Sequence, residues 1–293
     1  MRFDFFANDD ELHGHCKCTR HFVSAMDSQT SPGKEDSTGN LSTGWPWPHF
    51  PRTDDPSSGI DQTTYDNLVR YTKYSSGAYQ VLCPRPMGNT LVEQFVDLIT
   101  STQGFIARDD NRQELVVAFR GTKEIVSVLI DTSLMLTPLR GDGLPPLSCV
   151  SVSSGSSDEP RVHTGFLAAY QSVARTALEC LRAQLDAHPS YRIVVAGHSL
   201  GGSIGSIASI AIKYTFAEKD VQLYTFGQPR TGDSAFAELV EDMVGIDNIF
   251  RAVHSVDGVP TMIPTKLGYR HHATEYWQFT EPRKFFYINV HVQ

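Results

Sequence analysis

The chain has 293 residues, of which 40% are hydrophobic and 20% are charged, and a formal net charge of -8. This composition is typical of a globular protein with a full core, and the negative charge argues against a nucleic-acid backbone as its partner. No apolar run is long enough to cross a bilayer, and the five cysteines are too few and too scattered for a disulfide-rich scaffold.

Residues 1–58 are predicted to be a disordered N-terminal segment, because Ser, Thr, Gly, Pro and charged residues dominate much of it. Its His13–Cys18 group, with His21, matches no zinc template, so we expect no metal site. The N-terminus shows no apolar signal-peptide core, which favours retention in the cytoplasm, although Asn40 begins a glycosylation sequon that has meaning only in a secreted protein. We expect one globular domain over residues 59–293.

The first part of this domain is predicted to hold one helix followed by three strands. Asp61 is a good helix start, and Tyr65, Leu68, Val69, Tyr71 and Tyr74 follow it at helical spacing. Strands are predicted over residues 91–101, 103–107 and 114–120. The third strand ends at Gly121-Thr122, so Thr122 is expected at the carboxyl end of a strand, where open α/β sheets bind ligands.

Residues 123–139 allow two interpretations. They are rich in Ile, Val, Leu and Met, which is typical of a buried helix or strand. The same residues directly follow a predicted site loop, so they could instead form a mobile amphipathic lid over a pocket, spanning residues 123–136. Residues 140–160 are predicted to be a surface loop, and a long amphipathic helix follows over residues 166–188.

The stretch Gly197-His198-Ser199-Leu200-Gly201 is the centre of the predicted fold. A β-branched run, 193–196, precedes it as a buried strand, and a helix of small and apolar residues, 203–212, follows it. A serine on such a sharp turn needs neighbours without Cβ two residues away on either side. The turn lifts the Ser199 hydroxyl above the sheet and aims the first helix amides at any oxyanion formed there. A glycine-rich turn without chemistry is the alternative.

Further strands and helices follow the predicted nucleophile turn. Strands are predicted over residues 221–226 and 248–253, a helix over residues 233–244, and a terminal hairpin from strands within 269–279 and 284–292. Together these elements predict an α/β-hydrolase fold, in which a central, mostly parallel sheet carries helices on both faces and a nucleophile elbow.

Ser199 needs a base, and that base needs a carboxylate to orient it. In this fold the chain order is serine, acid, histidine. Asp257 is the natural acid, because it follows a strand that is next but one from the Ser199 strand. His254 precedes Asp257 and does not fit the order, whereas His271 and His272 follow too closely, at a strand entrance. This leaves His291, near the end of the chain, as the candidate base, and the alternative is that no competent base is present.

Six motifs together resemble the fungal class 3 lipases, which include type A feruloyl esterases. The resemblance covers roughly residues 71–279 and is carried by Val117–Thr122, Leu136–Pro138, Val162–Phe166, Gly197–Gly202, Thr225–Arg230 and Asp257–Pro260. It implies that Ser199 is the nucleophile, Asp257 the acid of the triad, and the amides of Thr122 and Leu200 the oxyanion hole, with the Thr122 hydroxyl as a further donor. It also implies a lid after Thr122. The chain departs from the family in showing no signal peptide and in the short stretch that follows Glu275-Tyr276-Trp277.

The resemblance implies an extracellular lipase acting on acylglycerols or other lipid esters without metal or cofactor. The apolar residues of 123–136 favour lipid esters, because an open lid is stabilised at a lipid–water interface. A feruloyl-type esterase on soluble esters is one alternative, and a non-catalytic hydrolase-fold protein is the other. The oligomeric state and the pairing of the cysteines do not follow from the sequence.

Overall fold

The computed structural model describes residues 59–122, 125, 134–146, 148, 159–254 and 257–278, and the backbone alone of residues 289–291. The predicted disordered segment 1–58, with Asn40 and the His13–Cys18 group, lies outside the described residues. So does most of the predicted lid, 123–136, of which only residues 125 and 134–136 are described.

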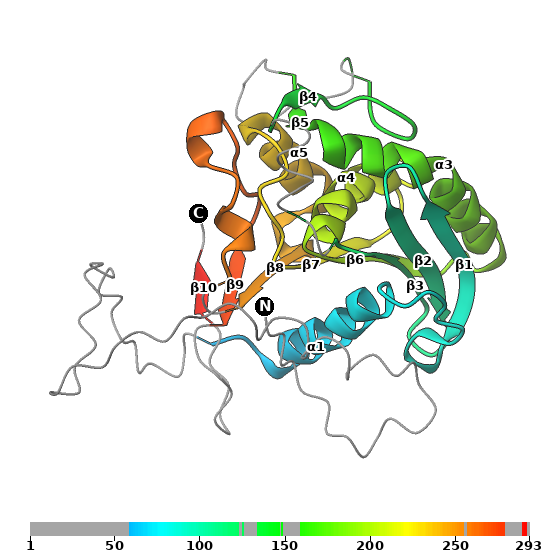
Figure 1. Cartoon of the computed structure of the whole chain (residues 1–293). Coiled ribbons are helices and arrows are strands. Elements are labelled where there is room, and N and C mark those ends of the chain that lie inside the picture. The colour runs from blue at the N-terminus through cyan, green and yellow to red at the C-terminus, as the bar shows by residue number, and fades with distance from the viewer. Residues whose placement is uncertain are drawn as a thin grey trace, which may run out of the picture.

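An eight-stranded sheet with the order β1-β2-β3-β6-β7-β8-β9-β10 organises the described chain (Figure 1). Strands β3 and β6 to β9 run parallel, whereas β1, β2 and β10 join through antiparallel pairs, so the predicted mostly parallel sheet is confirmed. The strands are β1 Thr90–Asp97, β2 Thr102–Asp109, β3 Glu114–Phe119, β6 Arg192–His198, β7 Val221–Phe226, β8 Ile249–His254, β9 Glu275–Gln278 and β10 Asn289–His291. A separate antiparallel pair consists of β4 Leu136–Pro138 and β5 Arg161–His163.

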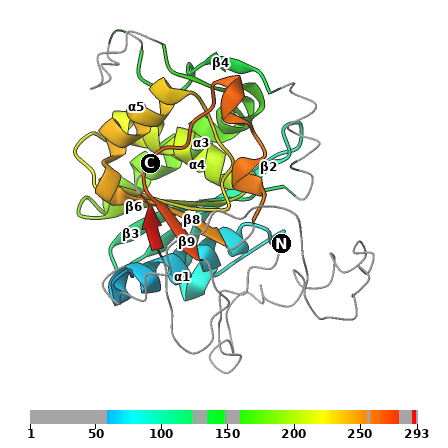
Figure 2. The same cartoon turned by 90° about the vertical axis from the view of Figure 1, so that its left-hand side faces the viewer.

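Helices cover both faces of the sheet, as predicted (Figure 2). Helix α1 (Gln62–Gly77) lies on one face, and α3 (Thr164–Ala187), α4 (Leu200–Thr215) and α5 (Ser234–Val244) lie on the other. The continuous apolar run of β6 supplies both layers: Ile193 and Val195 belong to the larger core cluster, and Val194 and Ala196 to the smaller one under α1. A central parallel strand buried on both faces needs such an uninterrupted run.

Helix and turn boundaries follow from local chemistry. Asp61 caps α1, because its Oδ1 accepts the Thr64 N–H at 3.0 Å and its Oδ2 accepts the Thr64 hydroxyl at 2.7 Å. Asp233 caps α5 in the same way through the Phe236 N–H at 2.9 Å. Short 3-10 turns are η3 Pro86–Gly88, η5 Ile246–Asn248, η6 Val259–Thr261 and η7 Thr265–Leu267.

The C-terminal part differs from the predicted hairpin in where its first strand begins. Residues 269–274 are not a strand, because this segment folds inward: His271 and His272 are buried, and the Arg270 N–H donates to the Gly232 carbonyl at 2.9 Å. Strand β9 therefore begins at Glu275, and β10 pairs with it antiparallel, as predicted.

Two further observations concern the cysteines and the helices. Cys83 is disulfide-bonded, whereas Cys180 on α3 is a free thiol. In the part of the chain that the structure describes, no helix combines the length and the apolar character needed to span a bilayer.

Candidate active site

Ser199 occupies the sharp turn between β6 and α4. Its backbone has φ 56° and ψ -126°, a strained conformation for a residue with a side chain, and its N–H donates to the Phe226 carbonyl on β7 at 2.8 Å. A Cβ at Gly197 would overlap the Gly201 carbonyl, and one at Gly201 would overlap the Phe119 carbonyl on β3. The predicted need for two flanking glycines is therefore confirmed on steric grounds. Ser199 itself is only 3% exposed.

The loop after β3 lies directly against this turn. A Cβ added at Gly121 would come within 3.0 Å of the Ser199 Cβ. Thr122, the next residue, is half-buried beside it, and Leu200 is the first residue of α4, where helix amides have no carbonyl of their own helix to bind. The structure thus brings the Gly121-Thr122 loop and the amino end of α4 to the same side of Ser199. Backbone amides at these two places can donate to a negative oxygen.

Tyr79, just after α1, joins the turn and the loop. Its hydroxyl lies 2.6 Å from the His198 Nδ1 and also accepts the backbone N–H of Gly121. Burial lowers the pKa of His198 to about 4, so its ring is neutral at pH 7 and shares one hydrogen bond with the Tyr79 hydroxyl. Tyr79 was not predicted, because nothing in the sequence indicates that residues 79, 121 and 198 meet.

Asp257 lies just beyond the carboxyl end of β8, two strands from β6. Its Oδ1 accepts the Val259 N–H at 2.9 Å, whereas its Oδ2 is buried without a hydrogen-bond partner among the described residues. Burial raises the pKa of this carboxyl above its ordinary value. A buried carboxylate oxygen without a donor is costly, and an imidazole N–H is a donor that would satisfy it.

Two side chains form hydrogen bonds to backbone carbonyls of the loop that carries Asp257. His271 lies with its Nε2 2.9 Å from the Pro260 carbonyl, and Arg230 donates from its Nη1 to the Ile263 carbonyl at 2.7 Å. Burial, as the largest cause, lowers the pKa of His271 to about 2, so this ring is neutral and donates to the carbonyl. These contacts fix the direction of the loop rather than reach Ser199.

The backbone of His291 lies far from Ser199. Strand pairing places His291 opposite Glu275, Glu275 opposite Arg251, Arg251 opposite Thr225, and Thr225 opposite Gly197. Four strand spacings separate the ends of this row, or roughly 19 Å. Catalytic hydrogen bonds need heavy atoms about 3 Å apart. The structure brings Ser199, Leu200 and Thr122 together and places Asp257 at the same edge, but it does not bring the His291 backbone to them.

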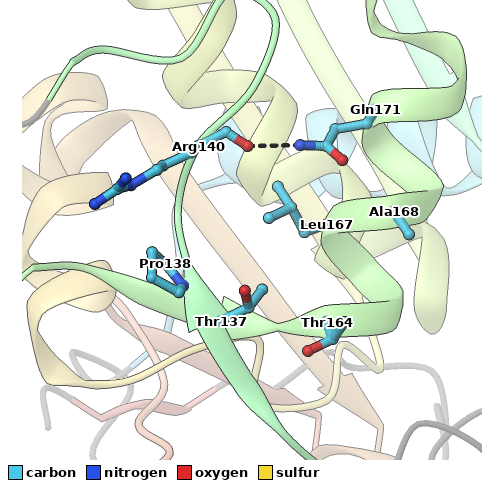
Figure 3. Close-up of a pocket in the computed structure, with 7 residues that line it drawn as sticks. All are labelled: Thr137, Pro138, Arg140, Thr164, Leu167, Ala168 and Gln171. Atoms are coloured by element: carbon cyan, nitrogen blue, oxygen red, sulfur yellow. Dashed lines mark hydrogen bonds between the residues drawn. The ribbon is translucent and has the colours of Figure 1, made fainter.

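A separate cavity of about 420 Å³ lies between β4 and the start of α3 (Figure 3). Its lining includes Thr137, Arg140, Thr164 and Leu167. The Gln171 amide crosses one end of it and donates to the Arg140 carbonyl at 2.6 Å (Figure 3). Neither Ser199 nor Asp257 lines this cavity, so it is not the space in which an ester would meet the serine.

Comparison with known proteins identifies the family of the chain. The profile of the family described as "Lipase (class 3)" matches residues 116–267, which is more than half of the chain and includes Thr122, Ser199 and Asp257. The chain is 29% identical over 227 residues to a lipase of Rhizopus niveus, covering 75% of this chain and 52% of that one. It is 32% identical over 187 residues to the secreted mono- and diacylglycerol lipase 1 of Fusarium solani, covering 64% and 50%. The chain thus spans about half the length of these two relatives.

A solved structure gives the same picture for the fold. The crystal structure of a triacylglycerol lipase from Penicillium expansum superposes with a TM-score of 0.67 at 26% identity, covering 75% of this chain and 81% of that one. The similarity therefore extends over most of the described sheet and its helices.

Proposed function

Because the chain belongs to the class 3 lipase family, we propose that it hydrolyses the ester bonds of acylglycerols or related lipid esters, with Ser199 as its nucleophile. The observation that carries this proposal is the strained Ser199 turn packed against the Gly121-Thr122 loop. Asp257, with one buried carboxylate oxygen unpartnered among the described residues, lies two strands away at the same edge of the sheet.

The proposed reaction has two halves. In the first, the Ser199 Oγ attacks the ester carbonyl while an imidazole takes its proton, and the Thr122 and Leu200 amides stabilise the tetrahedral oxyanion. The imidazolium then protonates the leaving alcohol as the ester C–O bond breaks. In the second half, water attacks the acyl-enzyme and gives its proton to the same imidazole. The imidazolium returns that proton to the Ser199 Oγ as the acyl C–O bond breaks, so the fatty acid leaves and Ser199 is restored. Asp257 accepts the other imidazole N–H and stabilises the positive ring.

For the base we propose His291, the histidine that remains once His271 and His272 are set aside. In the paired arrangement its backbone lies four strands from β6, so β10 has to leave β9 for an imidazole there to reach Ser199. Its pairing with β9 spans only three residues, 289–291, which makes such a displacement less costly than for the central strands. A His291→Ala variant tests this role: loss of activity together with loss of fluorophosphonate labelling supports it, and full activity rejects it.

For the substrate we propose acylglycerols rather than feruloyl esters, and for the place of action the outside of the cell. Two relatives support this choice by name, the secreted mono- and diacylglycerol lipase 1 of Fusarium solani and a secreted alkaline triacylglycerol lipase of Penicillium cyclopium. Ser199 is buried, which fits a site that is covered until an interface opens it. In our proposal, residues 123–136 form that cover.

A paired assay tests the reaction and the substrate class. The wild-type chain is expected to hydrolyse p-nitrophenyl butyrate and to turn over tributyrin faster above its solubility limit, whereas Ser199→Ala is expected to be inactive on both. Hydrolysis by Ser199→Ala at the wild-type rate would reject Ser199 as the nucleophile. Faster turnover of methyl ferulate than of tributyrin, with no rise on the emulsion, would reject the lipid-ester assignment and favour the feruloyl esterase.

A non-catalytic role is the second candidate, and the position of His291 in β10 favours it. A hydrolase-fold protein without a positioned base could still bind lipid. A fluorophosphonate probe distinguishes the two candidates, since it labels a serine only when a base activates it. Labelling that disappears in Ser199→Ala supports the enzyme, and no labelling of the wild-type chain supports the binding protein.

A further inference from the structure

Large apolar side chains gather on the surface around the turn between β1 and β2. Of the nine large hydrophobic residues found exposed in the described part of the chain, five belong to this region. Val81, Leu98 and Ile99 are 92%, 88% and 94% exposed, so almost none of their surface is covered by the protein. We call the five residues the hairpin-tip surface: Val81, Leu82, Val96, Leu98 and Ile99.

Side-chain hydrogen bonds show that these residues are neighbours. Gln94 on β1 donates from its Nε2 to the Val81 carbonyl at 2.6 Å, and Gln103 on β2 donates to the Gln80 carbonyl at 2.6 Å. Gln103 pairs with Val96 across the two strands. The 80–82 segment therefore lies along the end of the hairpin, whose turn carries Leu98 and Ile99.

The turn itself is fixed by polar contacts, although its tip is apolar. The Asp97 carboxylate accepts the Thr100 N–H at 2.7 Å and the Thr100 hydroxyl at 2.8 Å, and the Thr100 Oγ1 lies 2.9 Å from the Ser172 Oγ on α3. Turns usually carry Gly, Asn, Asp, Ser or Pro, so Leu98 and Ile99 are unusual there. An ordered turn that presents Leu and Ile to water indicates a binding surface rather than a frayed loop.

This surface lies at the same edge of the sheet as Ser199. Antiparallel pairing of Gly104 with Phe119 places the β1–β2 turn beyond the carboxyl end of β3, from which the Gly121-Thr122 loop continues. Arg120 joins the two: its Nη1 donates to the Gln103 Oε1 at 2.8 Å and its Nη2 to the Ser101 carbonyl at 2.9 Å. Arg120, which immediately precedes Gly121, therefore links the hairpin tip to the proposed oxyanion loop.

We propose that the hairpin-tip surface docks on an uncharged lipid–water interface and so brings the Ser199 edge to its ester; this rests on the function proposed above. The charge distribution selects a neutral interface. Between residues 79 and 103 the side chains include one cation, Arg85, and two anions, Glu93 and Asp97. Arg120 adds a second cation through its contact with Ser101, so the charges near the tip balance, and the whole chain has a formal net charge of -8. Peripheral proteins that bind anionic membranes instead surround their apolar residues with Lys and Arg.

The test measures binding without hydrolysis. In a Ser199→Ala background, sedimentation with phosphatidylcholine vesicles that contain dioleoylglycerol measures the bound fraction. Adding Leu98→Ser and Ile99→Ser is expected to weaken partitioning at least about tenfold, because both side chains lose their apolar contact with the lipid. The matched control is Ile246→Ser, a half-exposed residue just before β8 at the opposite edge, and it is expected to bind like the parent.

Further arms separate the alternatives. Parent-like vesicle binding by the double variant, or an equal loss in Ile246→Ser, would overturn the proposal, as would stronger binding to phosphatidylserine vesicles than to neutral ones. Sedimentation velocity checks whether the surface joins two copies of this chain instead: a dimer that the double variant converts to monomer, with vesicle binding unchanged, would also overturn it.

The last arm separates this surface from the proposed function. In the chain that retains Ser199, the double variant is expected to hydrolyse monomeric p-nitrophenyl butyrate within about twofold of the wild-type rate, with an unchanged thermal midpoint. Vesicle binding that depends on Leu98 and Ile99 in a chain without any esterase activity would support the surface and reject the enzyme. Normal hydrolysis with unaltered vesicle binding would reject the surface alone.

Discussion

At the scale of single residues, Tyr79 is the side chain that connects the serine turn to the loop beside it. Its hydroxyl contacts His198, which immediately precedes Ser199, and Gly121, which immediately precedes Thr122. Without this hydroxyl, a buried ring nitrogen and a buried amide lose a shared partner, and each such loss costs about 1–3 kcal/mol. Tyr79 is therefore a positioning residue for both sides of the site.

We expect Tyr79→Phe to lower kcat on p-nitrophenyl butyrate about tenfold, equivalent to about 1.4 kcal/mol in the barrier, with KM changed less than about twofold. Tyr170→Phe is the matched control, because the Tyr170 hydroxyl donates to the Asp142 carbonyl at 2.9 Å and contacts neither His198 nor Gly121. Both variants should lose some stability, but only Tyr79→Phe should lose rate. A Tyr79→Phe enzyme with the wild-type kcat would contradict the positioning role.

At the scale of elements, helix α1 is joined to the sheet at the edge opposite Ser199. Glu114, the first residue of β3, is fully buried and accepts the Tyr71 hydroxyl of α1 at 3.0 Å. The same carboxylate accepts the Arg112 Nε at 3.0 Å and forms an ion pair with Arg192 at the start of β6. One carboxylate thus joins α1, β3 and β6, the elements that support Tyr79 and the serine turn.

Replacing this carboxylate should change stability but not catalysis. We expect Glu114→Gln to lower the free energy of unfolding by about 1–3 kcal/mol. The loss is smaller than for a fully buried ion pair, because the side chains of Arg112 and Arg192 are partly exposed and stay hydrated. Urea denaturation measures the loss, and Tyr71→Phe serves as the comparison that removes only the hydroxyl. A change below about 0.5 kcal/mol would show that the buried carboxylate does not hold these elements together.

At the scale of the whole molecule, buried neutral histidines make the fold sensitive to acid. Burial lowers the pKa values of four of them: His163 and His198 to about 4, His272 to about 3 and His271 to about 2. In the unfolded chain their pKa is about 6.5, so below that pH the unfolded state binds more protons. Their contribution to stability is full above about pH 6.5 and is lost as the pH falls toward the folded values.

His272 allows a direct test, since it is 1% exposed and its Nε2 lies 3.0 Å from the Ser206 Oγ of α4. Urea midpoints of the wild type should fall between pH 6.5 and pH 4. Each histidine adds up to about 1.4 kcal/mol per pH unit to that slope. His272→Gln keeps a polar group near Ser206 but does not titrate, so its slope should be smaller, although its stability at pH 7 is also lower. Equal slopes for the two proteins would reject the assignment.

Features that depend on local sterics and periodicity can be read from the amino-acid sequence alone. Gly197 and Gly201 around Ser199 predict the sharp turn, because a side chain at either position would collide with neighbouring backbone. In the fold, a Cβ added at Gly197 or Gly201 would overlap a backbone carbonyl. The apolar run Ile193–Ala196 predicts a buried strand, and in the fold its residues are buried on both faces of the sheet. The cap at Asp61 marks the start of α1.

Contacts between residues that are distant in sequence depend on how the elements pack. Tyr79 and His198 are 119 residues apart in sequence, and their contact depends on how α1 packs under β6. The turn that carries Leu98 lies near the Gly121-Thr122 loop because of the register of β2 against β3. The position of His291 depends on the pairing of β10 with β9. Periodicity predicts that a strand is present and which face is buried. Strand order and register arise from packing between elements, so no local pattern contains them.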